Sequence, residues 1–366
     1  MGRLHDLHSQ QGQSPWLDNL KRGWITSGEL ERWVERGVRG LTSNPTIFQK
    51  AIADSPDYDA QFGDLVGGGA SVEDSYWALV TADIEDALRI LRPVHDESGG
   101  IDGRVSVEVA PGLARDTAGT EAAARHLWTA IDEPNLFVKI PGTAEGVPAI
   151  RACIAAGISI NVTLLFALSR YDEVAEAYLS GLEQLVADGG DPSQVASVAS
   201  FFVSRVDTNV DRQLEALGTP EALALKSTAA VANAQLAYQH FLATFTGPRW
   251  EALAAAGARV QRPLWASTST KDPSLPDTLY VDTLIGPDTV NTLPDGTLTA
   301  FDDHGTIART VDADPAAAQA VVDQLLSLGI DLEEVAVTLE EEGVASFAKS
   351  FDELLDTLSA KAEQLK

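Results

Sequence analysis

The chain has 366 residues, 45% of them hydrophobic, and a formal net charge of −28 at pH 7. The length suits one β/α barrel of about 250 residues with added helices, or two smaller domains. The negative charge argues against a nucleic acid or an anionic membrane as a partner. Cys153 is the only cysteine, which excludes an intramolecular disulfide and favours a reducing, cytoplasmic location.

Strand-like and helical segments alternate along the chain, as judged from apolar residues at periods of two and of 3.6. The predicted strands are residues 15–18, 38–44, 104–110, 136–140, 158–164, 195–203, 263–269 and 288–293. The predicted helices include residues 71–92, 116–131, 146–156, 168–187, 219–246, 316–328 and 346–365. This alternation predicts an α/β fold, a single (β/α)8 TIM barrel over residues 1–366, with C-terminal helices of about 316–366 packed on it.

Polar residues stand near the carboxyl ends of the predicted strands, where β/α barrels form their active sites. In chain order they are Asp18, Asn44, Glu108, Lys139, Thr163 and Ser200. The predicted fold therefore brings two carboxylates, an amine and several hydroxyl or amide groups to one end of the barrel.

Lys139 lies in the fourth predicted strand, in an apolar run that is typical of a strand buried on both faces. A buried ammonium ion is costly, so a lysine in such a place tends to lose its proton and can attack a carbonyl. The alternatives are that Lys139 ends an exposed edge strand or pairs with a carboxylate for structural reasons. Side-chain alternation puts Glu108, Asn161 and Thr163 on inward faces of neighbouring strands, which favours an imine-forming enzyme.

Five segments resemble, in the same order, the motifs of the transaldolase family, which belongs to the class I Schiff-base aldolases. They are residues 41–48, 107–109, 135–142, 161–166 and 200–205. The first resembles the family's first signature, and the third resembles the strand that carries its Schiff-base lysine. The chain is similar to the longer bacterial type, without a fused isomerase domain.

The resemblance implies a transaldolase of the pentose phosphate pathway. Such an enzyme transfers a dihydroxyacetone unit from sedoheptulose 7-phosphate to glyceraldehyde 3-phosphate, giving erythrose 4-phosphate and fructose 6-phosphate. It implies phosphorylated sugars as partners, no cofactor and no metal, and a monomer or a homodimer.

The resemblance also implies roles for individual residues. Lys139 would form an imine with the ketone, and Asp18 would take the proton from the C4 hydroxyl. Glu108, with a water near Thr163, would shuttle protons during imine formation. The residues that would bind the three-carbon fragment or line its pocket are Asn44, Asn161, Ser200 and Phe202.

Each role has a structural alternative. Asp18 could cap the helix that follows it, and Asn44 could cap the next one, because it precedes a proline. Thr163 could bond to a neighbouring backbone group, Glu108 could be only the counter-ion of the lysine, and Phe202 is expected chiefly to pack.

The expected phosphate site departs from the family's pattern. Arg205 matches the phosphate-facing arginine, but the seventh strand lacks the second arginine of the family's Ser-Phe-Arg segment. Lys271, with the hydroxyls of Ser267 and Ser269, is expected to replace it, since a lysine and hydroxyl donors can hold a phosphate. The alternative is that Lys271 merely neutralises Asp272.

Two other functions remain open from the sequence. One is an imine-dependent aldolase similar to fructose-6-phosphate aldolase, and the other is a non-catalytic barrel that binds sugar phosphates. A metal-dependent aldolase is disfavoured, because the six histidines are scattered and none is at a metal-ligand spacing.

Overall fold

The strands form a closed parallel barrel in this computed structural model, which describes residues 2–53 and 55–364. Each strand pairs with the next one in the chain, and β8 pairs with β1. The strands are β1 Gln13–Leu17, β2 Gly40–Thr42, β3 Arg104–Glu108, β4 Leu136–Pro141, β5 Ile160–Leu165, β6 Ser197–Phe202, β7 Arg262–Ala266 and β8 Thr289–Leu293. The predicted (β/α)8 barrel is therefore confirmed, with a strand at each predicted place.

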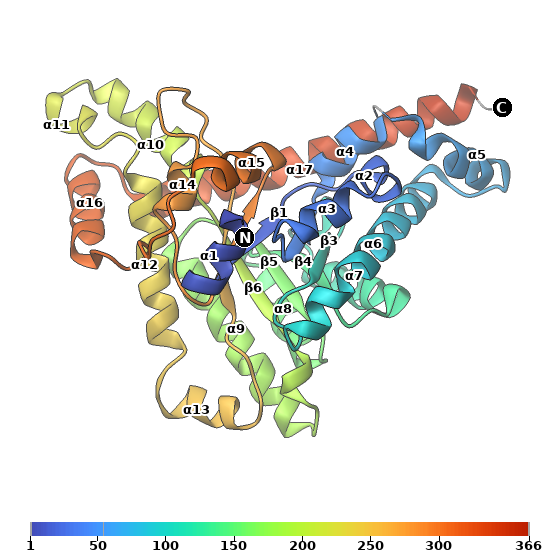
Figure 1. Cartoon of the computed structure of the whole chain (residues 1–366), viewed down its shortest axis with the longest axis horizontal. Coiled ribbons are helices and arrows are strands. Elements are labelled where there is room, and N and C mark those ends of the chain that lie inside the picture. The colour runs from blue at the N-terminus through green and yellow to red at the C-terminus, as the bar shows by residue number, and fades with distance from the viewer. Residues whose placement is uncertain (1, 54, 365–366) are drawn as a thin grey trace.

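Helices surround the barrel on its outer side (Figure 1). They are α1 Arg3–Gln11, α2 Arg22–Thr26, α3 Glu29–Glu35, α4 Pro45–Ala53, α5 Asp59–Gly67, α6 Val72–Glu97, α7 Thr117–Ile131, α8 Gly146–Ala155, α9 Leu168–Ala187, α10 Ser204–Leu217, α11 Pro220–Leu223, α12 Ala229–Thr244, α13 Gly247–Ala255, α14 Leu279–Asp282, α15 Asp295–His304, α16 Pro315–Ser327 and α17 Leu332–Gln364. Short 3₁₀ turns occur at Pro56–Tyr58, Pro111–Leu113 and Pro192–Gln194.

Two helix predictions were wrong in their bounds. Residues 219–246 do not form one helix, because α11 and α12 are separated around Ser227, whose φ of 60° is left-handed. The carboxylate of Asp211 accepts from the Ser227 backbone N–H at 2.8 Å and so holds this break. The last helix begins at Leu332 rather than at residue 346, so α17 is much longer than predicted.

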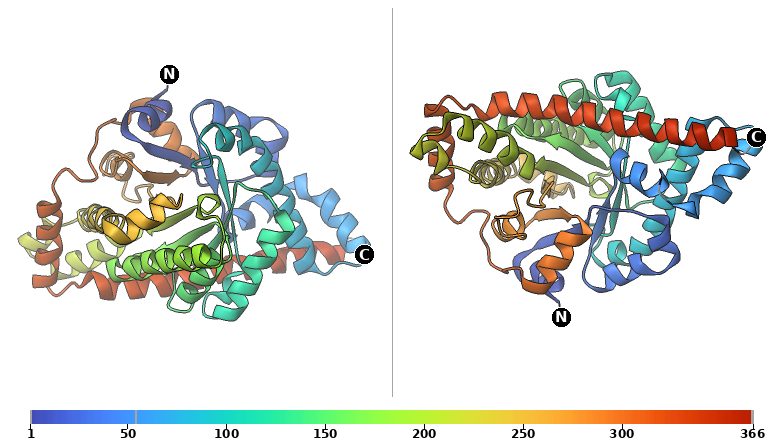
Figure 2. Two further views of the ribbon diagram at one scale, coloured as in Figure 1. Left: turned by 90° about the horizontal axis from the view of Figure 1, so that it is seen from below. Right: turned by 90° about the horizontal axis from the view of Figure 1, so that it is seen from above.

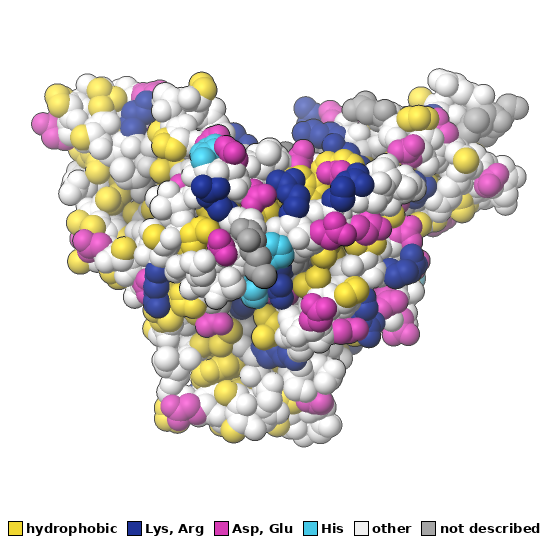
Figure 3. Space-filling model, viewed as in Figure 1, with side chains coloured by type: hydrophobic (Ala, Val, Ile, Leu, Met, Phe, Trp, Pro, Cys, Tyr) yellow, Lys and Arg dark blue, Asp and Glu magenta, His cyan; other side chains and the backbone are white. Residues whose placement is uncertain are grey.

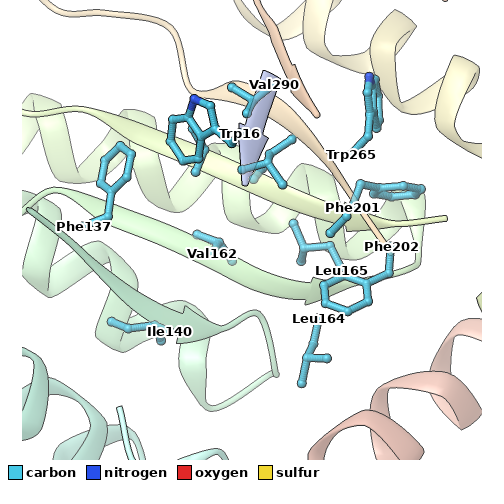
Figure 4. Close-up of a cluster of buried hydrophobic side chains, with 14 of the residues drawn as sticks. Trp16, Phe137, Ile140, Val162, Leu164, Leu165, Phe201, Phe202, Trp265 and Val290 are labelled. Carbon is cyan, nitrogen blue, oxygen red and sulfur yellow. The ribbon is translucent and has the colours of Figure 1, made fainter. Parts of the chain in front are cut away.

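Large apolar side chains fill the barrel below the strand ends. The ring centroids of Trp16 on β1 and Phe137 on β4 lie 6.1 Å apart across the interior (Figure 4). Gly40 on β2 makes room for the indole, since a Cβ there would lie 2.4 Å from Cε2 of Trp16. The barrel is thus a packed core, with polar residues on both sides of this aromatic layer, and the predicted site residues lie on the side of the carboxyl ends of the strands.

The long C-terminal helix α17 extends across the molecule and ends near α5, where Lys361 forms an ion pair with Asp59 (Figure 2). It contacts α4, α6, α10 and β5. Its approach to β5 is close, because a Cβ at Gly343 would lie 2.8 Å from Cδ2 of Leu164. Leu164 itself has a φ of 60° beside the register shift between β5 and β6. The helix therefore docks through a glycine against a strained part of β5.

Gly343→Ala is expected to lower the free energy of unfolding by up to about 2 kcal/mol, because the overpacked contact with Leu164 outweighs the helix propensity that alanine adds. Chemical denaturation measures the change. The matched control is Gly296→Ala in α15, where nothing lies within 4 Å of the added Cβ. That change should be neutral or stabilise by up to about 1 kcal/mol. Equal effects of the two substitutions would contradict close docking of α17.

Acidic and basic side chains are interspersed over the face of the molecule seen in Figure 3. With a net charge of −28, an anionic substrate must be held by a local group of cations. No helix in residues 2–53 and 55–364 is long and apolar enough to cross a membrane. That the whole chain is one domain stays a prediction.

Candidate active site

A cavity of about 240 Å³ lies at the carboxyl ends of the strands. The predicted site residues that line it are Asp18, Asn44, Lys139, Thr163, Ser200, Phe202, Arg205, Ser267, Ser269 and Lys271. Glu108 and Asn161 lie behind this lining. The fold therefore gathers side chains from seven strands or the loops after them, although they are up to about 250 residues apart in the chain.

Lys139 is 4% exposed, on a strand that pairs with β3 on one side and β5 on the other. The alternative of an exposed edge strand is therefore wrong. Its Nζ lies 2.9 Å from Oε2 of Glu108, its direct neighbour in the β3–β4 register, and donates to the carbonyl oxygen of Ser43 at 3.2 Å. The amine thus sits at the floor of the cavity, in a closed ion pair.

Burial raises the pKa of Glu108 above that of an ordinary glutamate. The ammonium of Lys139 opposes this rise, and the nearby carboxylate of Asp18 adds to it. A carboxylate whose charge is disfavoured by burial accepts a proton readily from the ammonium beside it. The raised pKa of Glu108 therefore suits a group that exchanges protons with the side chain beside it.

Asp18 follows β1 and faces the cavity without capping a helix, since α2 begins at Arg22 after Lys21. The hydroxyl of Thr42 donates to Oδ1 of Asp18 at 2.7 Å and lies 2.6 Å from the hydroxyl of Thr292. Burial raises the pKa of Asp18, and the Lys139 ammonium opposes the rise. Asp18 is thus a carboxylate that Thr42 holds in place, and its raised pKa suits a general base.

Asn44 and Thr163 offer polar atoms to the cavity. Oδ1 of Asn44 accepts from the N–H of Ile47 at 2.9 Å and so caps α4, as the alternative reading expected. Its Nδ2 makes no hydrogen bond to the rest of the described chain and remains able to donate. The hydroxyl of Thr163 is buried, and no described residue bonds to it. Such an orphaned hydroxyl is suited to hold a water molecule.

Asn161 does not line the cavity. It is fully buried, its Nδ2 donates to Oγ of Ser106 at 3.0 Å, and its Oδ1 accepts from Oγ of Ser200 at 2.7 Å. These bonds tie β5 to β3 and β6 beside Lys139, which is the partner of Asn161 in the β4–β5 register. The placement suits a residue that orients the Ser200 hydroxyl, and a direct contact of Asn161 with substrate stays a prediction.

Arg205, in the first turn of α10, forms the basic end of the cavity. Its guanidinium lies 5.3 Å from the ring centroid of Phe202, and no carboxylate of the described residues lies within 4 Å of it. Burial lowers the pKa of Arg205. The charges of Asp18 and Glu342 oppose this shift. The side chain is thus a desolvated cation that forms no ion pair with a carboxylate of the described residues.

Lys271 stands beside this arginine. It donates to Oγ of Ser269 at 2.7 Å, and its pKa is lowered by burial and then by the charges of Arg205 and Lys50. The alternative partner, Asp272, instead accepts hydrogen bonds from Ser274. Two neighbouring cations without carboxylate partners are what a phosphate dianion requires.

The Ser267 hydroxyl lies at the same end of the cavity. It shares a hydrogen bond of 2.9 Å with the hydroxyl of Ser204. Ser267 has a φ of 55°, and its carbonyl accepts from the Ser204 N–H at the start of α10. It therefore fixes the start of the helix that carries the arginine.

A family model described as transaldolase/fructose-6-phosphate aldolase matches residues 15–358. The chain belongs to this family. A transaldolase of Parafrankia sp. (strain EAN1pec) is 55% identical over 97% of this chain and 96% of its own length. A transaldolase of Thermobifida fusca (strain YX) is 53% identical over 98% of both chains, and transaldolase 2 of Streptomyces coelicolor is 50% identical over 98% of this chain and 96% of its own.

Membership of the transaldolase/fructose-6-phosphate aldolase family confirms the resemblance found in the sequence motifs and makes the protein an enzyme of this type. These relatives carry the name transaldolase, so the aldolase alternative is not favoured. No group of three or more His, Cys, Asp or Glu side chains among the described residues is placed to hold a metal ion.

Several residues of the site were not predicted. Thr42 and Thr292 hold Asp18, and the Ser43 carbonyl receives the amine. Phe347 of α17 lies with its ring centroid 5.7 Å from Nζ of Lys139 and lines the cavity. The sequence signal at Phe347 was its place in an apolar helical stripe, which predicts packing but does not reveal what it packs against.

Proposed function

We propose that the protein works as a transaldolase through an imine on Lys139, moving a dihydroxyacetone unit from a ketose phosphate to an aldose phosphate. The observation that carries the mechanism is the buried ion pair of Lys139 and Glu108 at the floor of a cavity that also contains Asp18. An assay with fructose 6-phosphate and erythrose 4-phosphate should give sedoheptulose 7-phosphate. Without the acceptor aldose, turnover should nearly stop, whereas an aldolase would continue.

In the first half of the reaction, Lys139 passes a proton to Glu108 and attacks the C2 carbonyl carbon of the ketose. The proton returned from Glu108 lets the carbinolamine oxygen leave as water, which yields the imine. A water held by the unpartnered Thr163 hydroxyl carries protons between these groups. Phe347 covers the amine and keeps bulk water away from it.

In the second half, Asp18 removes the proton from the C4 hydroxyl. The C3–C4 bond then breaks, its electron pair moves into the imine to form an enamine, and an aldose phosphate leaves. Asn44 donates a hydrogen bond to the three-carbon fragment, and the Ser200 oxygen, whose proton is given to Asn161, accepts one from a hydroxyl of the fragment until an acceptor arrives. The same steps in reverse attach the fragment to the acceptor and free Lys139.

Glu108→Gln is expected to slow imine formation by about 10²–10⁴-fold, because an amide cannot carry the proton. The fold should persist, since the two side chains have the same shape. Rapid quenching with borohydride measures the rate at which the adduct forms. Glu145→Gln, at an exposed glutamate that pairs with Arg115, is the control. An unchanged rate in Glu108→Gln would remove its proposed role.

Arg205→Ala is expected to raise KM for phosphorylated sugars by about 10–100-fold with a smaller change in kcat, because it removes a charge-assisted contact to phosphate. Lys271→Ala should also raise KM for phosphorylated sugars, but by a smaller factor. Arg212→Ala, at an exposed arginine of the same helix, is the matched control. A KM that stays unchanged in both cavity variants would place the phosphate elsewhere.

A cytoplasmic location, and a monomer or homodimer as the working form, stay predictions that rest on the sequence.

A further inference from the structure

A second cavity, of about 410 Å³, lies at the amino ends of the strands, on the opposite side of the barrel from Lys139. Its wall is built from the loops that precede β3, β4, β5, β6 and β7, and from the ends of α6 and α7. Nothing in the proposed transfer reaction uses it. Its volume falls within the range of small-molecule sites.

Two arginines of this cavity have no carboxylate partner within 4 Å among the described residues. Arg104 is 2% exposed, and its guanidinium donates only to the carbonyl oxygens of Gly100 and Pro134. Arg259 donates from Nη2 to the carbonyl of Gly99 at 2.8 Å. Its Nη1 is shielded from solvent and has no hydrogen-bond partner in the described chain. In a protein of net charge −28, two such cations side by side are unexpected.

The nearest buried carboxylate is already occupied. Asp102 accepts from Arg39 at 2.7 Å and from Arg262 at 2.9 Å, so one negative charge serves two other arginines. Burial, together with repulsion from Arg259 and Arg262, lowers the pKa of Arg104 to about 9. The positive charge of this face is therefore only partly compensated, and a bound anion would relieve the repulsion.

Gly100 keeps space open between the guanidinium of Arg259 and the imidazole of His95. Gly100 has a φ of +84°, and a Cβ there would lie 3.0 Å from Nη1 of Arg259 and 3.3 Å from Nε2 of His95. The carboxylate of Asp96 also lines the cavity, but it bonds to Nε of Arg92 and to Nδ1 of His95. Asp96 therefore forms no ion pair with Arg104 or Arg259.

We propose that this cavity binds a small organic phosphate, with the phosphate group between Arg104 and Arg259 and the carbon part against Trp128. A phosphate dianion matches the charge of two guanidinium groups and accepts several hydrogen bonds from them, whereas a monocarboxylate would leave one cation unbalanced. The half-buried indole of Trp128 supplies the apolar wall. The site is separate from the phosphate end of the catalytic cavity at Arg205 and Lys271.

The test uses phenyl phosphate as the probe in isothermal titration calorimetry. The Arg205→Ala, Lys271→Ala double variant serves as the background, so that binding at the catalytic cavity is suppressed. We expect one equivalent to bind. Adding Arg259→Gln should weaken binding at least tenfold, while Arg125→Gln, at an exposed arginine that pairs with Glu121, should leave it unchanged.

A second variant guards against a folding defect in Arg259→Gln. Gln194 is exposed and lines the same cavity, so Gln194→Glu adds one negative charge and loses only surface hydrogen bonds to Asp191 and Ser193. It should also weaken the binding of phenyl phosphate several-fold. The proposal is overturned if the background variant binds no probe, or if it binds the probe equally well after both substitutions.

Discussion

Lys139→Met is expected to lower the kcat of dihydroxyacetone transfer by about 10⁴-fold or more, because among the described residues no other amine lies at the floor of the cavity beside a proton carrier. Methionine fills the space of the lysine stem as far as Cε and lacks the amine. A coupled assay of transfer from fructose 6-phosphate to erythrose 4-phosphate measures the loss. Lys226→Met, which breaks a surface pair with Glu215, should be nearly as active as the parent.

The same substitution should also affect stability. Removing the ammonium leaves the 4%-exposed side chain of Glu108 without its counter-ion, which costs about 3–5 kcal/mol when such a charge stays buried. Adding Glu108→Gln to Lys139→Met should therefore restore part of the lost free energy of unfolding without restoring activity. If the double variant regained activity, Lys139 would not be the nucleophile.

Asp18→Asn is expected to lower kcat by about 10²–10⁴-fold by removing the base that takes the C4 proton. Imine formation does not need this base, so the variant should stop after the first half of the reaction. Borohydride should then trap the whole ketose phosphate on the protein, rather than a three-carbon fragment. Mass spectrometry of the intact chain distinguishes the two adducts. Asp188→Asn, at an exposed residue that accepts from Gln184, is the control.

The raised pKa of Asp18 also fixes two pH dependences. A base must be deprotonated, so activity should fall as the pH decreases through this raised pKa.

The pKa of Asp18 in the folded state lies above its unfolded value of about 3.9. Between these two values the folded state holds more protons than the unfolded state, so stability decreases as pH rises. Asp18→Asn removes this loss, and its Tm at pH 7 should exceed that of the parent. A lower Tm would mean that the charged carboxylate stabilises the fold.

Much of the barrel could be predicted because its strands are short, buried and separated by amphipathic helices. Glu108, Lys139 and Thr163 were placed near one another because parallel strands end at the same edge and side chains alternate along them. The barrel register then makes Glu108 a direct neighbour of Lys139, and Thr163 a neighbour of Pro141. These relations depend on local periodicity, which a sequence displays.

The contacts that were missed join segments far apart in the chain. Phe347 lies over Lys139 because α17 docks on β5 through Gly343, and no local pattern encodes that docking. Alternation predicted the inward face for Asn161, but it could not show that the side chain is fully buried behind the cavity lining. The break before α12 arises from the bond between Asp211 and Ser227, which belong to different segments.

The most direct test of the mechanism is to incubate the protein with fructose 6-phosphate alone, reduce it with borohydride and map the modified peptide. We expect a reduced dihydroxyacetone adduct on Lys139, because cleavage proceeds and no acceptor removes the fragment. The other lysines near the cavity, Lys50 and Lys271, should stay unmodified. An adduct on either of these, or none on any lysine, would contradict an imine on Lys139.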